Sequence, residues 1–216
     1  MGLLPTDTGQ SQQAQEMIER QADNSKKLIG EINLSRTEIR LSGAGGQGIV
    51  LAGQILGQAA SLYEKGKSAT FTQSYGPEAR GGSCSAEVVI SNESVGYPYV
   101  ISPQVLVVMS QEAYNKYTAS LSPETLIIID TDLVKPSASH NPHILSIPAT
   151  SLARDMGRVV VANIIMLGFV AAVSDVVSAK ALKESILATV PEGTGEFNIK
   201  AFTTGYDYGL KHGKKS

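Results

Sequence analysis

Residues 39–48 have the sequence Ile-Arg-Leu-Ser-Gly-Ala-Gly-Gly-Gln-Gly, and this stretch decides the fold. It contains the pattern Gly-x-Gly-x-x-Gly at Gly43, Gly45 and Gly48, directly after a short apolar segment and directly before apolar residues at helical spacing. In a strand–turn–helix unit, glycines allow a tight turn, and the backbone amides at the start of the helix can hold a phosphate. The stretch therefore predicts an α/β domain with an anion-binding turn.

The rest of the chain alternates between strand and helix patterns. The runs at 105–109 and 125–130 are apolar at nearly every position, which is typical of central strands covered on both faces. Further strands are expected at 68–73, 84–91 and 144–148, and helices at 49–60, 111–120, 179–190 and 197–208. This alternation predicts a mostly parallel sheet with helices on both faces, a Rossmann-like three-layer sandwich.

One segment departs from a regular parallel pattern. The sequence Ser-Asn-Glu-Ser at 91–94 is typical of a tight turn, and the residues at 95–101 that follow it have the composition of a strand. We therefore expect an antiparallel hairpin here, so that the predicted sheet is mixed.

Length and charge exclude several classes of protein. The 216 residues are enough for one domain of ordinary size, and 42% of them are hydrophobic, which suits a globular protein with a full core. The net charge of −2 gives no electrostatic reason to expect binding to nucleic acid or to an anionic membrane. The start of the chain lacks a basic segment followed by an apolar one, so we expect no signal peptide and a cytosolic location.

The cysteine and histidine residues do not predict a metal centre. Cys84 is the only cysteine, which excludes an intrachain disulfide and a cysteine-ligated iron–sulfur cluster held by this chain alone. His140 and His143 share a loop rich in Asn and Pro, with no cysteine nearby and no helix to present them. We expect these histidines to be structural or solvent-exposed rather than metal ligands.

The N-terminal residues differ in composition from the rest. Residues 1–36 are rich in polar and charged side chains with scattered apolar ones, so they cannot bury enough surface to fold alone. We expect a flexible arm here, or a helix formed against a partner, followed by one α/β domain over 37–216.

An apolar run at 159–173 is interrupted only by Asn163 and Gly168. At 15 residues it is shorter than the roughly 20 residues that cross a bilayer, and a helix that is apolar all round is normally buried. For a chain of this size, we expect it to be covered by another subunit as well. The chain alone should then be poorly soluble.

A second unusual loop follows the strand expected at 68–73. Residues 74–83 have the sequence Ser-Tyr-Gly-Pro-Glu-Ala-Arg-Gly-Gly-Ser, in which Arg80 is the one strong anion donor. The loop should lie beside the glycine turn at the carboxyl edge of the sheet, where such sheets bind ligands. Glu78 could simply pair with Arg80 or with another neighbouring residue. No histidine lies near Ser74, Ser83 or Cys84 in the sequence, so neither loop carries a nucleophile with its base.

The glycine turn alone leaves several interpretations open. Recognition of NAD also needs an acid at the end of the second strand, and here no acid appears before Glu78. A purely structural use of the glycines, for close helix–sheet packing, is a second interpretation. The third, which we favour, is an anionic ligand other than NAD or a cofactor shared with a neighbouring subunit.

Together the two loops resemble the gamma subunit of 2-oxoacid:ferredoxin oxidoreductases. The stretch 39–48 resembles the opening of that subunit, and 74–82 is similar to its second signature in the form met most often in the 2-oxoglutarate enzymes. Asn163 within its apolar run and the sequence Phe-Asn-Ile-Lys-Ala-Phe at 197–202 also match in position and type. The resemblance covers roughly residues 37–210.

The resemblance implies a function in a multi-subunit enzyme. Such enzymes convert a 2-oxoacid and coenzyme A to the acyl-CoA and carbon dioxide, and they pass electrons to ferredoxin. The resemblance implies that thiamine diphosphate, Mg²⁺ and the 4Fe-4S clusters belong to alpha, beta and ferredoxin-like partner subunits. This chain is then a required subunit without catalytic residues of its own, which helps to form the coenzyme A site and the subunit interfaces.

The resemblance also implies roles for single residues. Cofactor-binding positions on the two loops would be Gly45, Gly46, Gln47, Gly48, Ser74, Arg80 and Gly82. Interface positions would be Tyr75, Glu78 and Asn163. The alternatives are a gamma subunit of a pyruvate or 2-oxoisovalerate enzyme, a stand-alone NAD(P)-binding protein, and a structural adaptor without a ligand.

Overall fold

The computed structural model describes residues 36–76, 82–137 and 143–213. Three predictions lie outside these residues: the N-terminal arm, the structural or solvent-exposed role of His140, and the roles of Glu78 and Arg80. The strands are β1 (Arg36–Ala44), β2 (Ser68–Tyr75), β3 (Ser83–Ser91), β4 (Val105–Val108), β5 (Leu126–Asp130) and β6 (Ile144–Ile147). The helices are α2 (Ile49–Leu62), α3 (Gln111–Thr118), α4 (Ala149–Asp155), α5 (Ala162–Val173), α6 (Ala179–Thr189) and α7 (Gly195–His212), with a 3-10 turn at Val159–Val161.

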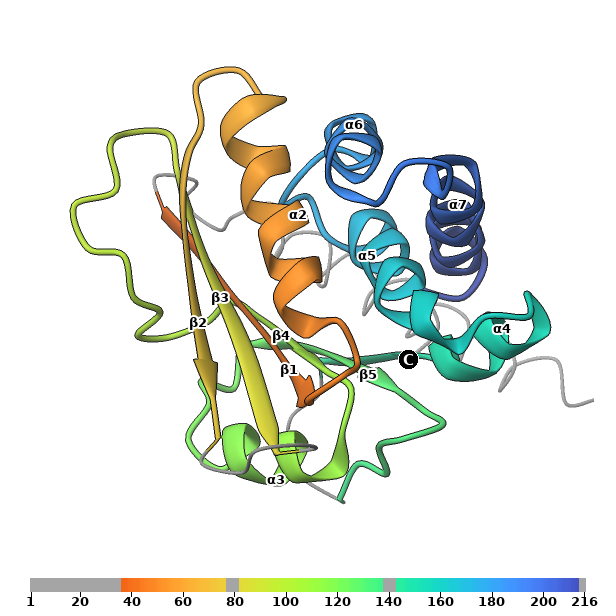
Figure 1. Ribbon diagram of the computed structural model, residues 1–216. Coiled ribbons are helices and arrows are strands. Elements are labelled where there is room, and N and C mark those ends of the chain that lie inside the picture. The colour runs from red at the N-terminus through yellow and green to blue at the C-terminus, as the bar shows by residue number, and fades with distance from the viewer. Residues whose placement is uncertain (1–35, 77–81, 138–142, 214–216) are drawn as a thin grey trace, which may run out of the picture.

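The described strands form one six-stranded sheet in the order β2-β3-β1-β4-β5-β6 (Figure 1). β1, β4, β5 and β6 pair in parallel, whereas β3 pairs antiparallel with both β1 and β2. β2 therefore runs in the same direction as β1, and β3 alone runs the other way. The expected mostly parallel, mixed sheet is confirmed.

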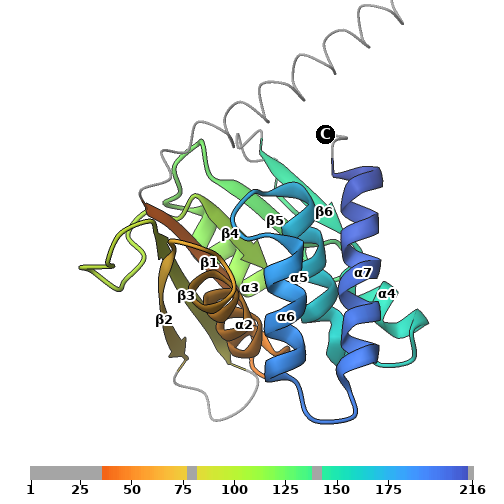
Figure 2. The same cartoon turned by 90° about the horizontal axis from the view of Figure 1, so that it is seen from above.

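Helices cover both faces of the sheet, as expected, but unequally. α2 packs on β1, β2 and β3, and α5, α6 and α7 lie side by side on the same face (Figure 2). The main core fills this space and includes Ile39, Ile128 and Phe169. On the other face α3 covers a smaller core, with Leu106, Tyr114 and Ile129 among its members. Alternate apolar side chains of a strand point to opposite faces of the sheet, so the continuous apolar runs of β4 and β5 contribute to both cores.

The expected hairpin at 91–101 is wrong. β3 ends at Ser91, and residues 92–104 form an irregular loop, while the hairpin partner of β3 is β2. Side chains from β1 bind the backbone of this loop in place of a strand ladder. The Glu38 carboxylate accepts hydrogen bonds from the amides of Ile101 and Ser102, at 2.6 and 2.8 Å, and Arg36 donates to the carbonyls of Tyr97 and Tyr99.

The expectation that the run at 159–173 needs a second subunit to cover it is also largely wrong. Every residue from Ala162 to Val170 is buried by this chain's own elements, chiefly α2, α4, α6 and α7. Only Val159 and Val160 remain exposed, at 50% and 69%. Among the described helices, none is long and apolar enough to span a membrane.

Candidate functional site

The glycine turn lies at the carboxyl end of β1, where the chain enters α2. Gly45 and Gly46 are exposed, whereas Gly43 is buried. Gly46 and Gly48 have φ angles of 93° and 72°, in the left-handed region that side chains other than glycine rarely adopt. The turn conformation therefore requires glycine at both positions.

The two loops predicted to form one site do lie together. The Gly45 amide donates to the Gly82 carbonyl at 2.9 Å, and Ala44 pairs with Ser83 in the β1–β3 register. Ser74 and Tyr75 end β2 on the same edge of the sheet, and Tyr75 is 63% exposed. The expected meeting of the loops is confirmed for their described residues.

The Gln47 side chain is directed into the protein. Its Oε1 accepts a hydrogen bond from the Ala44 amide at 2.6 Å, and its Nε2 donates to the Met109 carbonyl at 2.7 Å. The carboxamide thus ties the glycine turn to the end of β4. The Gln47 amide, which was expected to contact the ligand, donates instead to the Ala44 carbonyl at 3.2 Å.

The Asn163 side chain lies inside this chain, with 2% of the residue exposed. Its Nδ2 donates to the Gly48 carbonyl at 3.0 Å, and its Oδ1 accepts from the Ile164 amide at 2.9 Å. Because this side chain is buried and bonded within its own chain, it does not reach a surface where it could make the expected contact with another subunit. In this structure Asn163 joins the first turns of α2 and α5.

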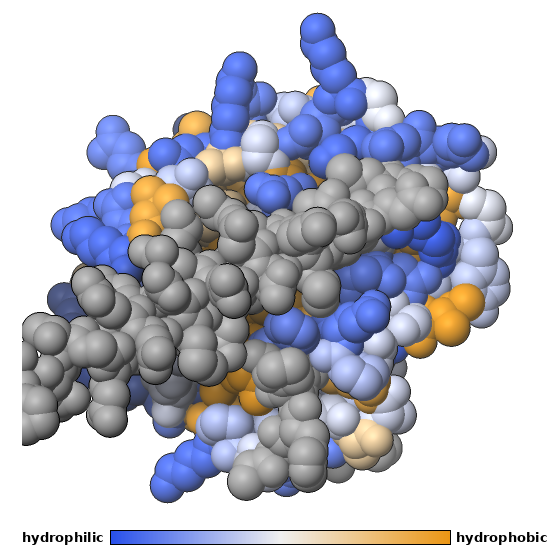
Figure 3. Space-filling model, turned by 180° about the vertical axis from the view of Figure 1, so that it is seen from behind, coloured by the Kyte–Doolittle hydropathy of each residue, from blue (hydrophilic) through white to orange (hydrophobic). Residues whose placement is uncertain are grey.

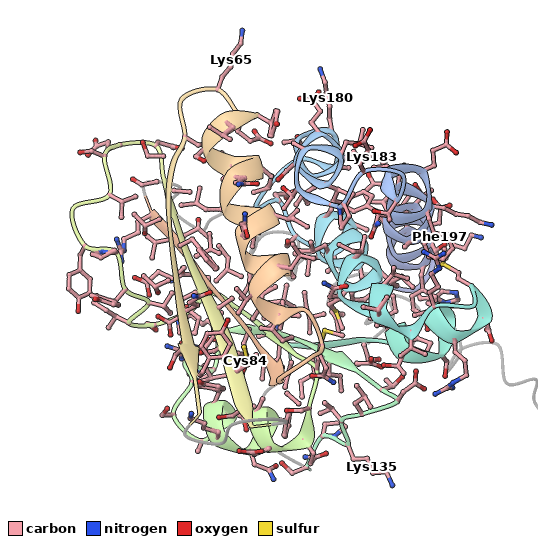
Figure 4. The ribbon with its side chains drawn as sticks, viewed as in Figure 1. Lys65, Cys84, Lys135, Lys180, Lys183 and Phe197 are labelled. Atoms are coloured by element: carbon pink, nitrogen blue, oxygen red, sulfur yellow. The ribbon has the colours of Figure 1, made fainter. Side chains whose placement is uncertain are left out.

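The starts of these two helices give the turn a positive electrostatic character. Within the described chain, the N-caps of α2 and α5 make no side-chain cap hydrogen bond, and neither first turn holds an acidic residue. The amides of Ile49, Val50 and Leu51 have no acceptor within α2, and the helix dipole places partial positive charge here. Lys65 and Lys180 project from the opposite end of the helical layer (Figure 4). The backbone, rather than these lysines, would attract an anion.

No described side chain near the turn is equipped for nucleophilic catalysis. Cys84 is buried at the start of β3, close to the end of β1 (Figure 4), and burial raises the pKa of its thiol. Ser42 donates its hydroxyl to the Cys84 carbonyl at 3.1 Å. Across residues 36–76, 82–137 and 143–213, no group of three or more His, Cys, Asp or Glu side chains could hold a metal ion.

The strand order weighs against the dinucleotide interpretation. In a dinucleotide fold the second parallel strand lies next to the first and carries the acid that binds ribose. Here antiparallel β3 occupies that position, and β2 lies one strand further out and ends in Ser74 and Tyr75. The sequence has no acid at the end of β2, and the fold places β2 one strand away from the position next to β1. Both observations count against a dinucleotide site.

A buried carboxylate at the same edge escaped prediction. Asp130 ends β5 with 0% exposure, and its Oδ2 accepts hydrogen bonds from the Thr150 hydroxyl at 2.6 Å and the Thr150 amide at 3.1 Å. Burial raises the pKa of the Asp130 carboxyl, and the hydrogen bonds from Thr150 and Asp132 act in the opposite direction. Asp130 thereby fixes the start of α4. The one feature of the sequence that could have indicated this buried carboxylate is the position of Asp130 at the end of an apolar strand.

Replacing Thr150 with valine should reduce stability more at neutral than at acidic pH. Loss of the hydroxyl donor leaves the Asp130 carboxylate less satisfied and raises its pKa in the folded state further above the unfolded value. Such a shift costs stability as pH rises through the folded pKa, and the cost vanishes below the unfolded pKa. We expect a deficit of about 1–3 kcal/mol at neutral pH in urea unfolding, falling toward acid.

Thr203→Val is the matched control, because the Thr203 hydroxyl donates to the neutral Ile199 carbonyl at 2.9 Å. Its effect on the free energy of unfolding should not depend on pH. An equally pH-independent deficit for Thr150→Val would contradict the role given to Asp130.

Comparison with known proteins places the domain in a family. Residues 38–208 match the family model of pyruvate ferredoxin/flavodoxin oxidoreductases. The chain is 48% identical over 177 residues to the 2-oxoglutarate synthase subunit KorC of Methanocaldococcus jannaschii, a match that covers 80% of this chain and 93% of that protein.

Solved structures share the fold. The gamma subunit of a keto/oxoacid ferredoxin oxidoreductase from Geobacter sulfurreducens matches with a TM-score of 0.74 and 42% identity, over 82% of this chain and 98% of that one. The 2-oxoglutarate:ferredoxin oxidoreductase of Magnetococcus marinus, solved with 2-oxoglutarate, coenzyme A and succinyl-CoA bound, matches with a TM-score of 0.72. At 23% identity, and over 82% of this chain and 31% of that longer one, this match shows the fold alone.

Proposed function

The chain belongs to the pyruvate ferredoxin/flavodoxin oxidoreductase family, and we propose that it is the gamma subunit of a 2-oxoglutarate:ferredoxin oxidoreductase. The complex would interconvert 2-oxoglutarate, coenzyme A and oxidised ferredoxin with succinyl-CoA, carbon dioxide and reduced ferredoxin. The similarity to a 2-oxoglutarate synthase subunit over nearly its whole length supports this substrate. The location of the complex would be the cytoplasm.

The glycine turn supports a role in binding coenzyme A. Its backbone is exposed at Gly45 and Gly46, and it opens an uncapped helix whose first amides lack acceptors within the helix. These groups suit the phosphates of coenzyme A, and the Gly82 carbonyl lies beside them. Ser74 lies at the end of β2 one strand further out, opposite Ser85 of β3, and is the more distant of the proposed positions. Gly45 donates its amide to Gly82, so the donors we propose are the amides of Gly46 and of residues 48–51. The turn and α2 would bind the ligand without taking part in bond making.

The other cofactors would belong to partner subunits. Thiamine diphosphate with Mg²⁺ would supply the carbanion chemistry on the 2-oxoacid, and 4Fe-4S clusters would carry the electrons. Cys84 cannot hold such a cluster, because a cluster needs several thiolates and this thiol is buried within the sheet. We therefore propose alpha, beta and ferredoxin-like subunits as partners.

Reconstitution tests the function and the substrate together. The chain alone should show no turnover, and the complex assembled with its partner subunits should reduce ferredoxin with 2-oxoglutarate and coenzyme A. Omission of this chain should abolish that activity. Turnover by the isolated chain would contradict the proposal, and a preference of the complex for pyruvate or 2-oxoisovalerate would correct the substrate.

Two exposed valines beside the site are candidates for the subunit contact. Val159 and Val160 lie just before the first turn of α5, which Asn163 ties to the glycine turn. Much of the surface is hydrophilic, with separate apolar patches on the face seen in Figure 3. Adjacent exposed apolar side chains next to a shared site suit an interface core.

The double variant Val159→Ser, Val160→Ser should weaken assembly with the partner subunits by about tenfold or more in dissociation constant. Mass photometry of the complex over a dilution series measures this loss. Leu187→Ser is the control, because Leu187 is similarly exposed, at 56%, but lies on α6. Equal weakening by both variants would count against the valine contact.

A further inference from the structure

We propose that Gln47 and Asn163 are positioning residues, whose carboxamides hold the glycine turn in the geometry that binds coenzyme A. This inference rests on the proposed function. Neither side chain would touch the ligand. Each would act through the backbone of the turn, Gln47 from the side of β4 and Asn163 from the side of α5.

Gln47 fixes the first half of the turn. Its Oε1 accepts from the Ala44 amide, three residues back, which closes the turn on itself. Its Nε2 reaches the Met109 carbonyl, directly after β4. The Met109 amide in turn donates to the Ser42 carbonyl at 2.8 Å. The turn is therefore fixed to the neighbouring parallel strand and cannot move independently of it.

Asn163 fixes the second half of the turn. The Gly48 carbonyl accepts both the Ala52 amide, which is the first hydrogen bond of α2, and Asn163 Nδ2. The other end of the same carboxamide accepts the amide of Ile164. Because a buried carboxamide with both ends bonded has one favoured orientation, it sets the position of the start of α2 relative to α5.

The glycines of the motif make room for these two carboxamides. A Cβ on Gly43 would meet Gln47 Oε1, and a Cβ on Gly48 would meet Asn163 Nδ2. A Cβ on Gly46 would meet nothing within 4 Å. Gly43 and Gly48 are thus required for internal packing against the two side chains. The exposed backbone at Gly45 and Gly46 is left to face the ligand.

The chain offers a matched control for each positioning residue. Gln104 makes the same pair of bonds at the opposite end of the sheet, where it accepts from the Glu38 amide at 2.6 Å and donates to the Ser102 carbonyl at 2.9 Å. Asn198 is also buried, and its Nδ2 donates to the Thr194 carbonyl at 2.9 Å at the start of α7. Neither control residue contacts the glycine turn.

The test compares Gln47→Leu with Gln104→Leu, and Asn163→Ala with Asn198→Ala, in the assembled complex. We expect the first variant of each pair to raise the KM for coenzyme A by about tenfold or more, because small displacements of binding groups cost large factors. The KM for 2-oxoglutarate should stay within about twofold of the unchanged enzyme. The control variants should lower the Tm without changing the KM for coenzyme A.

Two further variants keep the outcome decisive. Where Gln47→Leu fails to fold, Gln47→Glu retains the acceptor for the Ala44 amide but loses the donor to Met109, and it should raise the same KM. Gly46→Val changes the exposed turn directly. If Gly46→Val raises the KM for coenzyme A and the Gln47 and Asn163 variants do not, the positioning role is wrong. If none of them changes it, the coenzyme A site itself is wrong.

Discussion

Replacing Gly205 with alanine is expected to destabilise the domain by about 3 kcal/mol or more, a large share of the total stability of an ordinary domain. Gly205 lies in the middle of α7, and a Cβ there would meet the Ile165 carbonyl of α5. Gly168 of α5 is placed in the same way against the Phe202 carbonyl. The two helices can relieve such contacts only by moving apart, because the obstacle is backbone.

Urea unfolding of the isolated chain measures this effect. The alanine variant gains about 1 kcal/mol from helix propensity, so the observed loss is the net of a larger steric cost. Gly96→Ala is the control, because a Cβ on Gly96 would have no atom within 4 Å and the residue has no positive φ. A Gly205→Ala variant as stable as Gly96→Ala would contradict the close crossing of α5 and α7.

Replacing Gly48 with alanine is expected to weaken binding of coenzyme A by the assembled complex by about tenfold to a hundredfold. An alanine at a φ of 72° is strained, and its Cβ would displace the Asn163 carboxamide. Both effects move the start of α2, where the amides proposed to hold the phosphates lie. Titration calorimetry of the complex with coenzyme A measures the change.

Gly66→Ala separates the two causes. Gly66 has a nearly identical φ of 70° but no atom within 4 Å of a Cβ, and it follows α2 at the end away from the turn. The Gly66 variant should carry the same backbone strain and should therefore be less stable, but its affinity for coenzyme A should be unchanged. Equal affinities for the Gly48 and Gly66 variants would contradict the placement of the ligand at the turn.

Local patterns were enough to predict most of the fold. The continuous apolar runs became β4 and β5, and the glycine motif became a strand–turn–helix, because these signals depend on neighbouring residues. The position of β3 between β1 and β2 could not be predicted in this way. The pattern of a single strand does not show which other strand it will pair with. Residues 95–101, which contain Gly96 and Pro98, were therefore mistaken for the hairpin partner of β3.

The candidate site was predicted in part for the same reason. The two loops could be placed together because carboxyl ends of parallel strands share one edge, and the Gly45–Gly82 hydrogen bond confirms this. The Met109 carbonyl that Gln47 binds and the Gly48 carbonyl that Asn163 binds lie 62 and 115 residues away in the sequence, so no local pattern reveals these two contacts. The cover of α5 by α7 depends in the same way on glycines far apart in the chain.

Hydrogen–deuterium exchange of the assembled complex, with and without coenzyme A, tests the central claim most directly, because it observes the proposed amide donors without any substitution. A peptide spanning residues 44–52 contains the turn and the first amides of α2. Coenzyme A should slow exchange in this peptide, while a peptide from α6 on the same chain should be unaffected. Slowed exchange confined to other subunits, with no change at residues 44–52, would contradict a coenzyme A site at the glycine turn.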